Sequence, residues 1–461
     1  MAVERFSLAK AARLVSVQDL TTGSISRHLL TTASYMLVTM VFQTLYFLID
    51  LYWVGRLGKE AVAAVGIAGN LTFLVLAVSQ MLGVGTTTLV SQAAGRRDHG
   101  RALLVFNQSQ VLSLVVGAIF LASALVLRGP YAATLGADER TVGLARDYLL
   151  WFIPAMALQF AMVAMGAALR GTGNFKPGMI VQTATVILNM VLAPFLIFGW
   201  VTGVPFGVAG AAISSLVAVA VGTIWLALYF VKPSGYLHFS RSQWLPDLPL
   251  LGRMLRVGAP AGAEFGLLAA YLFLVYTITR PFGAEAQAGF GIGLRIVQAG
   301  FLPVVALGFA VAPVAGQNFG ARLPERVKRT FAVAAILATG AMALWGLVCF
   351  FASVPMLRVF SIDPHVVTVG HEYLRIIAWT FTASGLIFVA SSMFQAMGNT
   401  IPPLGASVAR IVLTAIPAVL LSGTPGFELR WLWYLSAGTI MFQLVVVLSL
   451  LRREFRLRLL E

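Results

Sequence analysis

Long apolar runs recur along the whole chain, and they constrain its fold more than any other feature. A helix of about 20 apolar residues crosses the hydrocarbon core of a bilayer, which is about 30 Å thick. Inside that core only helices and closed barrels satisfy every backbone hydrogen bond. With 59% hydrophobic and 11% charged residues, the 461-residue chain has too little polar surface for a soluble protein. We therefore predict an all-α polytopic membrane protein with twelve transmembrane helices. They are expected near residues 29–55, 62–90, 102–127, 146–169, 177–200, 208–231, 257–280, 285–315, 328–353, 371–397, 401–421 and 430–451.

The second half of the sequence repeats the first at an offset of 225 residues. Without any gap, Gly58 pairs with Gly283, and Asn174 pairs with Asn399. Chance does not keep one register over so long a stretch. Because six spans is an even number, both copies have the same orientation, which makes this a parallel repeat. The sequence predicts two six-helix bundles, with a substrate site where the halves meet.

Basic residues lie mostly between the apolar runs, so the net charge of +15 does not indicate nucleic-acid binding. The positive-inside rule instead places both termini and the central polar segment in the cytoplasm. The predicted parts are an amphipathic cytoplasmic arm at 1–28, an N-terminal bundle at 29–231, a cytoplasmic linker at 232–256, a C-terminal bundle at 257–452 and a basic cytoplasmic tail at 453–461.

One acid lies within the first apolar run. Thr39, Gln43, Tyr46 and Asp50 follow each other at helical spacing, so they share one face of the helix. A charge in hydrocarbon costs about 3 kcal/mol on insertion scales, and such residues usually face the bundle interior or a water-filled cavity. We predict that Asp50 is functional. The alternative is an acid near the interface, solvated and without a task.

Polar residues in two other spans of the first half are expected near Asp50. They are Asn189 in the fifth span and Ser214 and Ser215 in the sixth. Asparagine in a membrane helix often only bonds another helix, so a structural role for Asn189 stays open. We predict that Tyr46, Asn189 and Ser215 form a cation-coupling site around Asp50.

The second half carries its own intramembrane charges, which are Glu264, Arg295 and Arg410. Helical rise places them within about a turn of one level. One acid beside two bases predicts a structural charge cluster in which Glu264 pairs with one or both arginines. A cation site is the alternative.

The repeat breaks its symmetry at these charges, because Asp50 pairs with Val275 and Arg295 pairs with Asn70. The two halves are therefore expected to have different roles. We predict that Gln43, Asn70 and Glu264 contact the substrate.

The sequence contains no metal-ligand triad, no nucleophile with a base and no Walker loop. Cys349 is the single cysteine, which excludes an internal disulfide and a cysteine-based metal site. We therefore expect no enzyme activity, no metal and no cofactor. Without a nucleotide site, transport would depend on an ion gradient.

The chain resembles the multidrug and toxic compound extrusion (MATE) family in several segments at once. These are Asp50 with LYWVGRLGKEAVAAVGIA, then ALRGTGNFKPGM, then LNMVLAPFLIFG followed by GVAGAAIS, and VAGQNFGA in the second half. The resemblance implies two six-helix bundles arranged in a V, alternating access, and drug export in exchange for protons or sodium. It also implies that the coupling carboxylate is Asp50, with the family's asparagine at Asn189 and a hydroxyl at Ser215.

Two departures from the family pattern bear on the coupling ion. Many prokaryotic members have an aspartate where this chain has Ala193, and the sodium-coupled branch has acids in helices 7 and 10. Here Glu264 lies one turn earlier than that pattern, and helix 10 offers Ser384. Both departures weaken a sodium site. They favour a prokaryotic member near the branch named after DNA-damage-inducible protein F.

The predicted function is therefore secondary active efflux of cationic or amphipathic organic compounds in exchange for protons, by alternating access. Proton binding needs only one acid, whereas sodium needs several oxygen ligands. The alternatives are a sodium-coupled drug antiporter, a lipid-linked oligosaccharide flippase of the same superfamily and, from another class, a membrane receptor or channel. We expect a monomer in the inner membrane of a prokaryote, in contact with lipid and small molecules.

Overall fold

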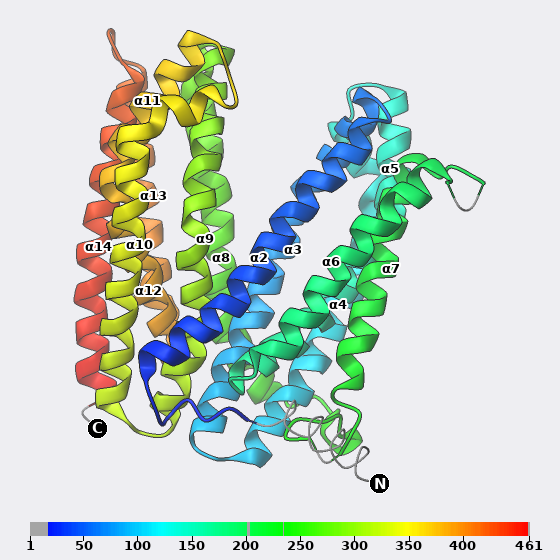
Figure 1. The fold of residues 1–461 in the computed structure, drawn as a ribbon, viewed down its shortest axis with the longest axis vertical. Coiled ribbons are helices and arrows are strands. Elements are labelled where there is room, and N and C mark those ends of the chain that lie inside the picture. The colour runs from blue at the N-terminus through cyan, green and yellow to red at the C-terminus, as the bar shows by residue number, and fades with distance from the viewer. Residues whose placement is uncertain (1–16, 201–202, 234, 460–461) are drawn as a thin grey trace. The chain divides into compact units, whose positions relative to one another are not determined.

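The structure is a computed structural model that describes residues 17–200, 203–233 and 235–459. Every regular element in these ranges is a helix (Figure 1). Within the described residues, twelve helical stretches are long and apolar enough to cross a membrane. The predicted all-α architecture with twelve spans is confirmed.

The chain divides into two compact units. One contains Ser34–Gly262, and the other contains Ala263–Glu461 together with Thr21–Ala33. The helices of the N-terminal unit are α2 (Ile25–Gly55) from Ser34 onward, α3 (Lys59–Gly95), α4 (His99–Leu135), α5 (Glu139–Gly171), α6 (Phe175–Phe198), α7 (Gly207–Leu228), the 3-10 turn η1 (Arg241–Gln243) and the first part of α8 (Leu248–Thr279). Those of the C-terminal unit are the rest of α8, η2 (Arg280–Phe282), α9 (Ala284–Gly320), α10 (Pro324–Arg358), α11 (Pro364–Ile377), η3 (Ala378–Thr380), α12 (Phe381–Met397), α13 (Ile401–Ser422) and α14 (Leu429–Leu459).

In each unit several helices pack around one central helix. In the N-terminal unit α5 contacts α3, α4 and α7, and in the C-terminal unit α9 contacts α10, α11 and α12. The core of the N-terminal unit is mainly aliphatic and aromatic, with Phe106 and Phe160 fully buried. α6 packs mainly on α7, and α13 packs mainly on α14.

The backbone confirms the internal repeat. Gly58 and Gly283 both have a positive φ, 112° and 92°, in the turn that precedes the second helix of each copy. Arg97 and Arg322, also 225 positions apart, are the two non-glycine residues of the described chain with positive φ, at 59° and 56°. The turn hydrogen bonds match as well, since the Arg97 amide donates to Ala94 and the Arg322 amide donates to Phe319.

The polar segment between the halves is shorter than predicted, because α8 begins at Leu248 and not near residue 257. Pro249 lies in the first turn of this helix, where a proline costs no hydrogen bond. The segment before it is fastened to two buried side chains of α4. Asn107 Oδ1 accepts from the backbone amide of Ser240, and Gln108 Oε1 accepts from that of Asp247.

Candidate functional site

Asp50 lies on the inner side of α2 and is 9% exposed. Its neighbours Leu51 and Tyr52 are exposed on the other side of the helix, as expected for a lipid-facing surface. One turn further along, the ring of Trp53 makes edge contacts with Phe198 and Trp200 at the end of α6. These aromatic contacts hold the end of α2 that carries Asp50 against α6.

One serine joins three helices next to Asp50. Asn189 Nδ2 on α6 donates to Ser215 Oγ on α7 at 2.9 Å, and Tyr46 OH on α2 lies 3.2 Å from the same oxygen. Ser215 Oγ can also donate to the backbone oxygen of Ala211, at 3.2 Å. If its proton goes there, the Tyr46 hydroxyl is the donor to Ser215. The structure thus brings together Tyr46, Asn189 and Ser215, whose role in coupling stays a prediction.

Two acceptor oxygens of this cluster have no donor. Asp50 Oδ1 and Asn189 Oδ1 are both buried, and neither has a hydrogen-bond partner among the residues that the structure describes. An ionised carboxylate and an amide oxygen can only accept, so each needs a hydrogen or a cation. Leaving such atoms unsatisfied costs about 1–3 kcal/mol each. The cluster is therefore suited to bind a proton or a small hard cation.

Tyr148 on α5 also belongs to the surroundings of Asp50. It is buried, and its hydroxyl and that of Tyr46 lie within electrostatic range of the Asp50 carboxylate. The sequence analysis did not predict it. The signal that could have found it is the repeat, because Tyr148 pairs with Tyr373, which is buried at the corresponding place in the C-terminal unit.

The remaining polar positions of the α2 face are less engaged. Thr39 is buried and donates to the backbone oxygen of Tyr35, within its own helix. Gln43 is half-buried. Ser214, the neighbour of the serine that joins the helices, is buried and donates only to Ala211 on its own helix. None of these residues is acidic, so they add no second carboxylate to the face that carries Asp50.

The C-terminal unit repeats the hydroxyl contacts but not the acid. Tyr271 OH on α8 lies 3.1 Å from Ser436 Oγ on α14, and Thr414 Oγ1 on α13 lies 2.9 Å from Thr439 Oγ1 on α14. Tyr271 and Thr414 pair with Tyr46 and Asn189 in the repeat. The position of Asp50 is taken by Val275, which is fully buried. A carboxylate at this level is therefore a feature of one copy only.

Two of the other predicted site residues, Glu264 and Arg295, belong to the C-terminal unit. Glu264 on α8 is half-buried and makes no salt bridge within the described ranges, although its charge and that of Arg410 interact at longer range. Arg295 on α9 and Asn70 on α3 are exposed. The predicted structural charge cluster and the predicted substrate contacts stay predictions.

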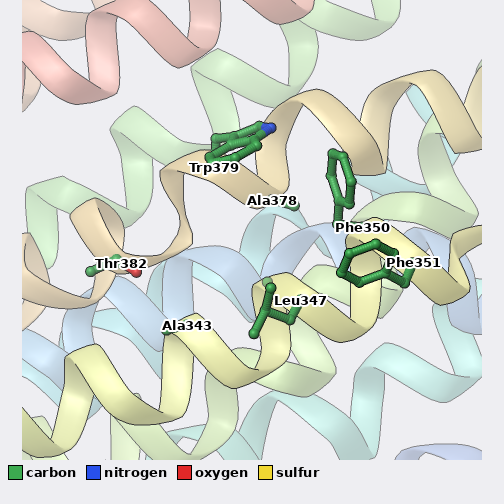
Figure 2. A pocket seen from close by; sticks show the side chains of 8 residues that line it. Ala343, Leu347, Phe350, Phe351, Ala378, Trp379 and Thr382 are labelled. Atoms are coloured by element: carbon green, nitrogen blue, oxygen red, sulfur yellow. The ribbon is translucent and has the colours of Figure 1, made fainter.

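An apolar groove lies on the C-terminal unit between α10 and the segment from η3 to α12, with a volume of about 300 Å³ (Figure 2). Pro355 and the non-helical backbone of Ala352 kink α10 near this level, and η3 interrupts the opposite wall. Arg375 stands 4.8 Å from the ring centroid of Phe350. The lining residues are Ala343, Gly346, Leu347, Phe350, Phe351, Ala378, Trp379 and Thr382. None of them is ionisable, so this groove is not the coupling site.

Comparison with known proteins finds a family match in each of the two halves of the chain. The family model MatE matches residues 36–195 and again residues 260–420. Probable multidrug resistance protein YoeA of Bacillus subtilis is 25% identical over 403 residues, which cover 86% of this chain and 87% of the relative. Multidrug export protein MepA of Staphylococcus haemolyticus is 25% identical and covers 79% and 80%. The FAD transporter of Shewanella oneidensis is 24% identical and covers 81% and 83%.

Solved structures share the fold. A multidrug resistance MATE family transporter in an outward-facing conformation aligns with a TM-score of 0.87 at 24% identity, covering 95% of this chain and 97% of that one. The MATE transporter VcmN of Vibrio cholerae, in its bent form, aligns with a TM-score of 0.87 at 21% identity, covering 96% and 99%. The chain is therefore an integral membrane protein that belongs to the MATE family of multidrug efflux transporters.

Proposed function

We propose that the protein is a secondary antiporter that exports cationic or amphipathic organic compounds in exchange for protons, with Asp50 as the proton-binding residue. The observation that carries this proposal is the pair of orphaned acceptors, Asp50 Oδ1 and Asn189 Oδ1, beside the serine that joins α2, α6 and α7. A proton on the carboxyl adds one O–H donor to a cluster that lacks one. Protonation thus removes the uncompensated charge of Asp50 and gives the cluster a donor that it lacks.

This chemistry links proton binding to the position of α2. Protonated Asp50 loses its charge and can bond to the α6 and α7 cluster, which already holds Tyr46 through Ser215. A cationic substrate then loses the charge that attracted it and leaves. Deprotonation restores the anion, loosens the bond to α6 and prepares the site for the next substrate. Proton and substrate therefore compete for one negative charge.

The proton is favoured over sodium by the composition of the cluster. Its single formal charge is Asp50, and Ala193 is buried where many relatives of this family have a second acid. No group of three His, Cys, Asp or Glu side chains in the described ranges could hold a metal ion. Sodium would have to rely on neutral oxygens of Asn189, Ser215 and Tyr46, which bind a cation more weakly than a second carboxylate.

The names of the relatives bear on the substrate, and the distribution of basic residues bears on the cell location. Two of them are named for multidrug resistance or export, which supports broad specificity for small organic molecules. A third is named a FAD transporter, so a relative of this chain carries a substrate with anionic groups. We further propose a monomer in the inner membrane of a prokaryote, with both termini in the cytoplasm, because Lys and Arg concentrate at the predicted inner face.

Purified protein in liposomes tests the coupling ion directly. Efflux of a fluorescent organic cation is followed with a pH gradient and with a sodium gradient, each imposed alone. The proposal expects transport with the pH gradient only. Transport driven by sodium at equal pH on both sides would replace the proton by sodium.

Asp50→Asn tests the residue. The variant keeps the shape of the side chain but cannot lose a proton, so proton-driven efflux should stop while thermal stability stays near that of the wild type. Asp147→Asn is the matched control, because it makes the same change on α5 at an exposed position next to Tyr148. Proton-driven efflux that persists in Asp50→Asn would exclude Asp50 from coupling.

A further inference from the structure

Arg410 lies on α13 within a membrane span and lacks a polar partner. Its Nε is buried without a hydrogen-bond partner, and the described residues give its side chain no hydrogen bond and no salt bridge. Its guanidinium stands over the ring of Tyr271 on α8, with Cζ 5.4 Å from the ring centroid. A cation in a membrane span is energetically costly and is usually paired with an acid or another polar group. The lack of such a partner at Arg410 therefore needs an explanation.

Other arginines in the same unit show what a structural arginine looks like in this protein. Arg326 donates through Nε to Asn318 and through both terminal nitrogens to the backbone oxygen of Gly23. Arg458 forms a salt bridge with Glu454 and donates to the backbone oxygen of Met397. Both fasten chain segments with their N–H groups. Arg410 fastens none.

The cation–π contact with Tyr271 holds the guanidinium without using its donors. Such a contact depends on the positive charge of the group, so the N–H donors remain for a planar, bidentate acceptor. The ring itself is held in place, because Tyr271 OH is hydrogen-bonded to Ser436 on α14. The result is an oriented cation with a free edge, which is the arrangement that recognises a carboxylate or a phosphate.

Glu264 completes the arrangement with a charge of opposite sign. It lies seven residues before Tyr271, so both side chains belong to one face of α8. The charges of Glu264 and Arg410 interact, yet the two groups are too far apart for a salt bridge. An acid and a base that interact electrostatically without forming a salt bridge suit a ligand that carries both signs.

The two copies of the repeat therefore differ in polarity. The N-terminal copy has Asp50 where the C-terminal copy has Val275, and the C-terminal copy has Arg410 where the N-terminal copy has Thr185. We infer that Arg410, oriented by Tyr271, forms an anion-binding subsite in the C-terminal unit that takes the carboxylate of an amphoteric organic substrate. This inference rests on the proposed function, since the ligand is taken to be a transport substrate.

The test uses two dyes that differ only in the group that Arg410 would bind. One is a rhodamine with a free benzoate, and the other is the methyl ester of the same dye. Binding is measured by fluorescence polarisation on full-length protein in nanodiscs of zwitterionic lipid. Hydrogen bonds to charged groups predict that Arg410→Gln weakens binding of the free acid roughly 10- to 100-fold and leaves binding of the ester within about twofold.

Two further variants keep the result interpretable. Arg410→Lys retains the charge but loses the planar fork, so its affinity for the acid should lie between those of the wild type and Arg410→Gln. Arg295→Gln removes the same charge from an exposed position of the same unit and should not change the preference for the acid. Adding anionic phospholipid to the nanodiscs should not displace the acid dye.

Specific outcomes would overturn the subsite. They are an acid dye that binds no better than its ester in the wild type, an equal loss of both dyes in Arg410→Gln, or displacement of the acid dye by anionic lipid, which would make the ligand a lipid headgroup. If Arg410→Gln does not fold, the lysine variant decides alone, and an unchanged acid preference there refutes bidentate binding. Asp50 is intact in every variant, so these results are independent of the proton-coupling test.

Discussion

Ser215 is the most informative single position for testing the site, because one oxygen holds three helices together. Ser215→Ala removes the contacts to Asn189 Nδ2 and to Tyr46 OH at once. Side-chain hydrogen bonds between membrane helices contribute about 0.6 kcal/mol each on average and up to about 1.7. Two such bonds therefore predict a loss of about 1–2 kcal/mol in the free energy of unfolding.

The neighbouring serine is a matched control for this change. Ser214 is equally buried on α7, but its hydroxyl donates only to Ala211 on the same helix, at 2.7 Å. Ser214→Ala should therefore cost less than about 0.5 kcal/mol, since no bond between helices is lost. The free energy of unfolding is measured in bicelles by steric trapping, with the same pair of labelled sites in both variants. Equal losses in the two variants would refute the view that Ser215 joins α2, α6 and α7.

Three more predictions address topology, the central segment and a helix start. In a cysteine-free background, a membrane-impermeant thiol reagent added outside should label Thr424→Cys but not Ser242→Cys, and equal labelling would reject cytoplasmic termini. Asn107→Ala removes one of the two sets of contacts that hold the segment before α8 to α4, so trypsin should cleave after Arg241 faster than in the wild type. An unchanged rate would show that the contacts of Gln108 are sufficient to hold it. Hydrogen bonds from the backbone and side chain of Thr141 at the start of α5 hold the pKa of Asp138 below its usual value. Asp138→Ala should therefore destabilise the protein at neutral pH, and the difference in stability should shrink as the pH falls through that lowered pKa. A difference in thermal unfolding that stays constant from neutral to acidic pH would contradict this cap.

The sequence allowed the spans and the repeat to be predicted because both depend on local properties. Apolar length decides which segments cross a membrane, and glycines at Gly58 and Gly283 mark the same turn in each copy. The start of α8 was misplaced because its first turns carry Arg253 and Arg256 and follow several prolines, so they read as polar loop. In the structure these turns are helical, and their apolar side chains, such as Met254, are buried.

The candidate site was only partly predictable. Helical spacing placed Tyr46 and Asp50 on one face, but spacing within one helix says nothing about which oxygen of another helix lies opposite. The three-helix contact at Ser215 and the proximity of Tyr148 depend on how α2, α5, α6 and α7 pack. The same limit applies to the stacking of Arg410 on Tyr271, which joins residues far apart in sequence.

Arg97 and Arg322 pose a problem of membrane insertion. Each adopts a left-handed backbone that glycine adopts freely and that costs another residue about 1 kcal/mol or more. Both copies nevertheless have arginine there, between the second and third helix of the bundle. These loops are on the predicted inner face, and a positive charge helps to keep such a loop from being translocated. Glycine at both positions should make the folded protein more stable. It should also cause the helical hairpins of the nascent chain to insert more often with inverted topology. Selection at these turns would then act on the orientation of the chain during synthesis and not on the stability of the finished protein.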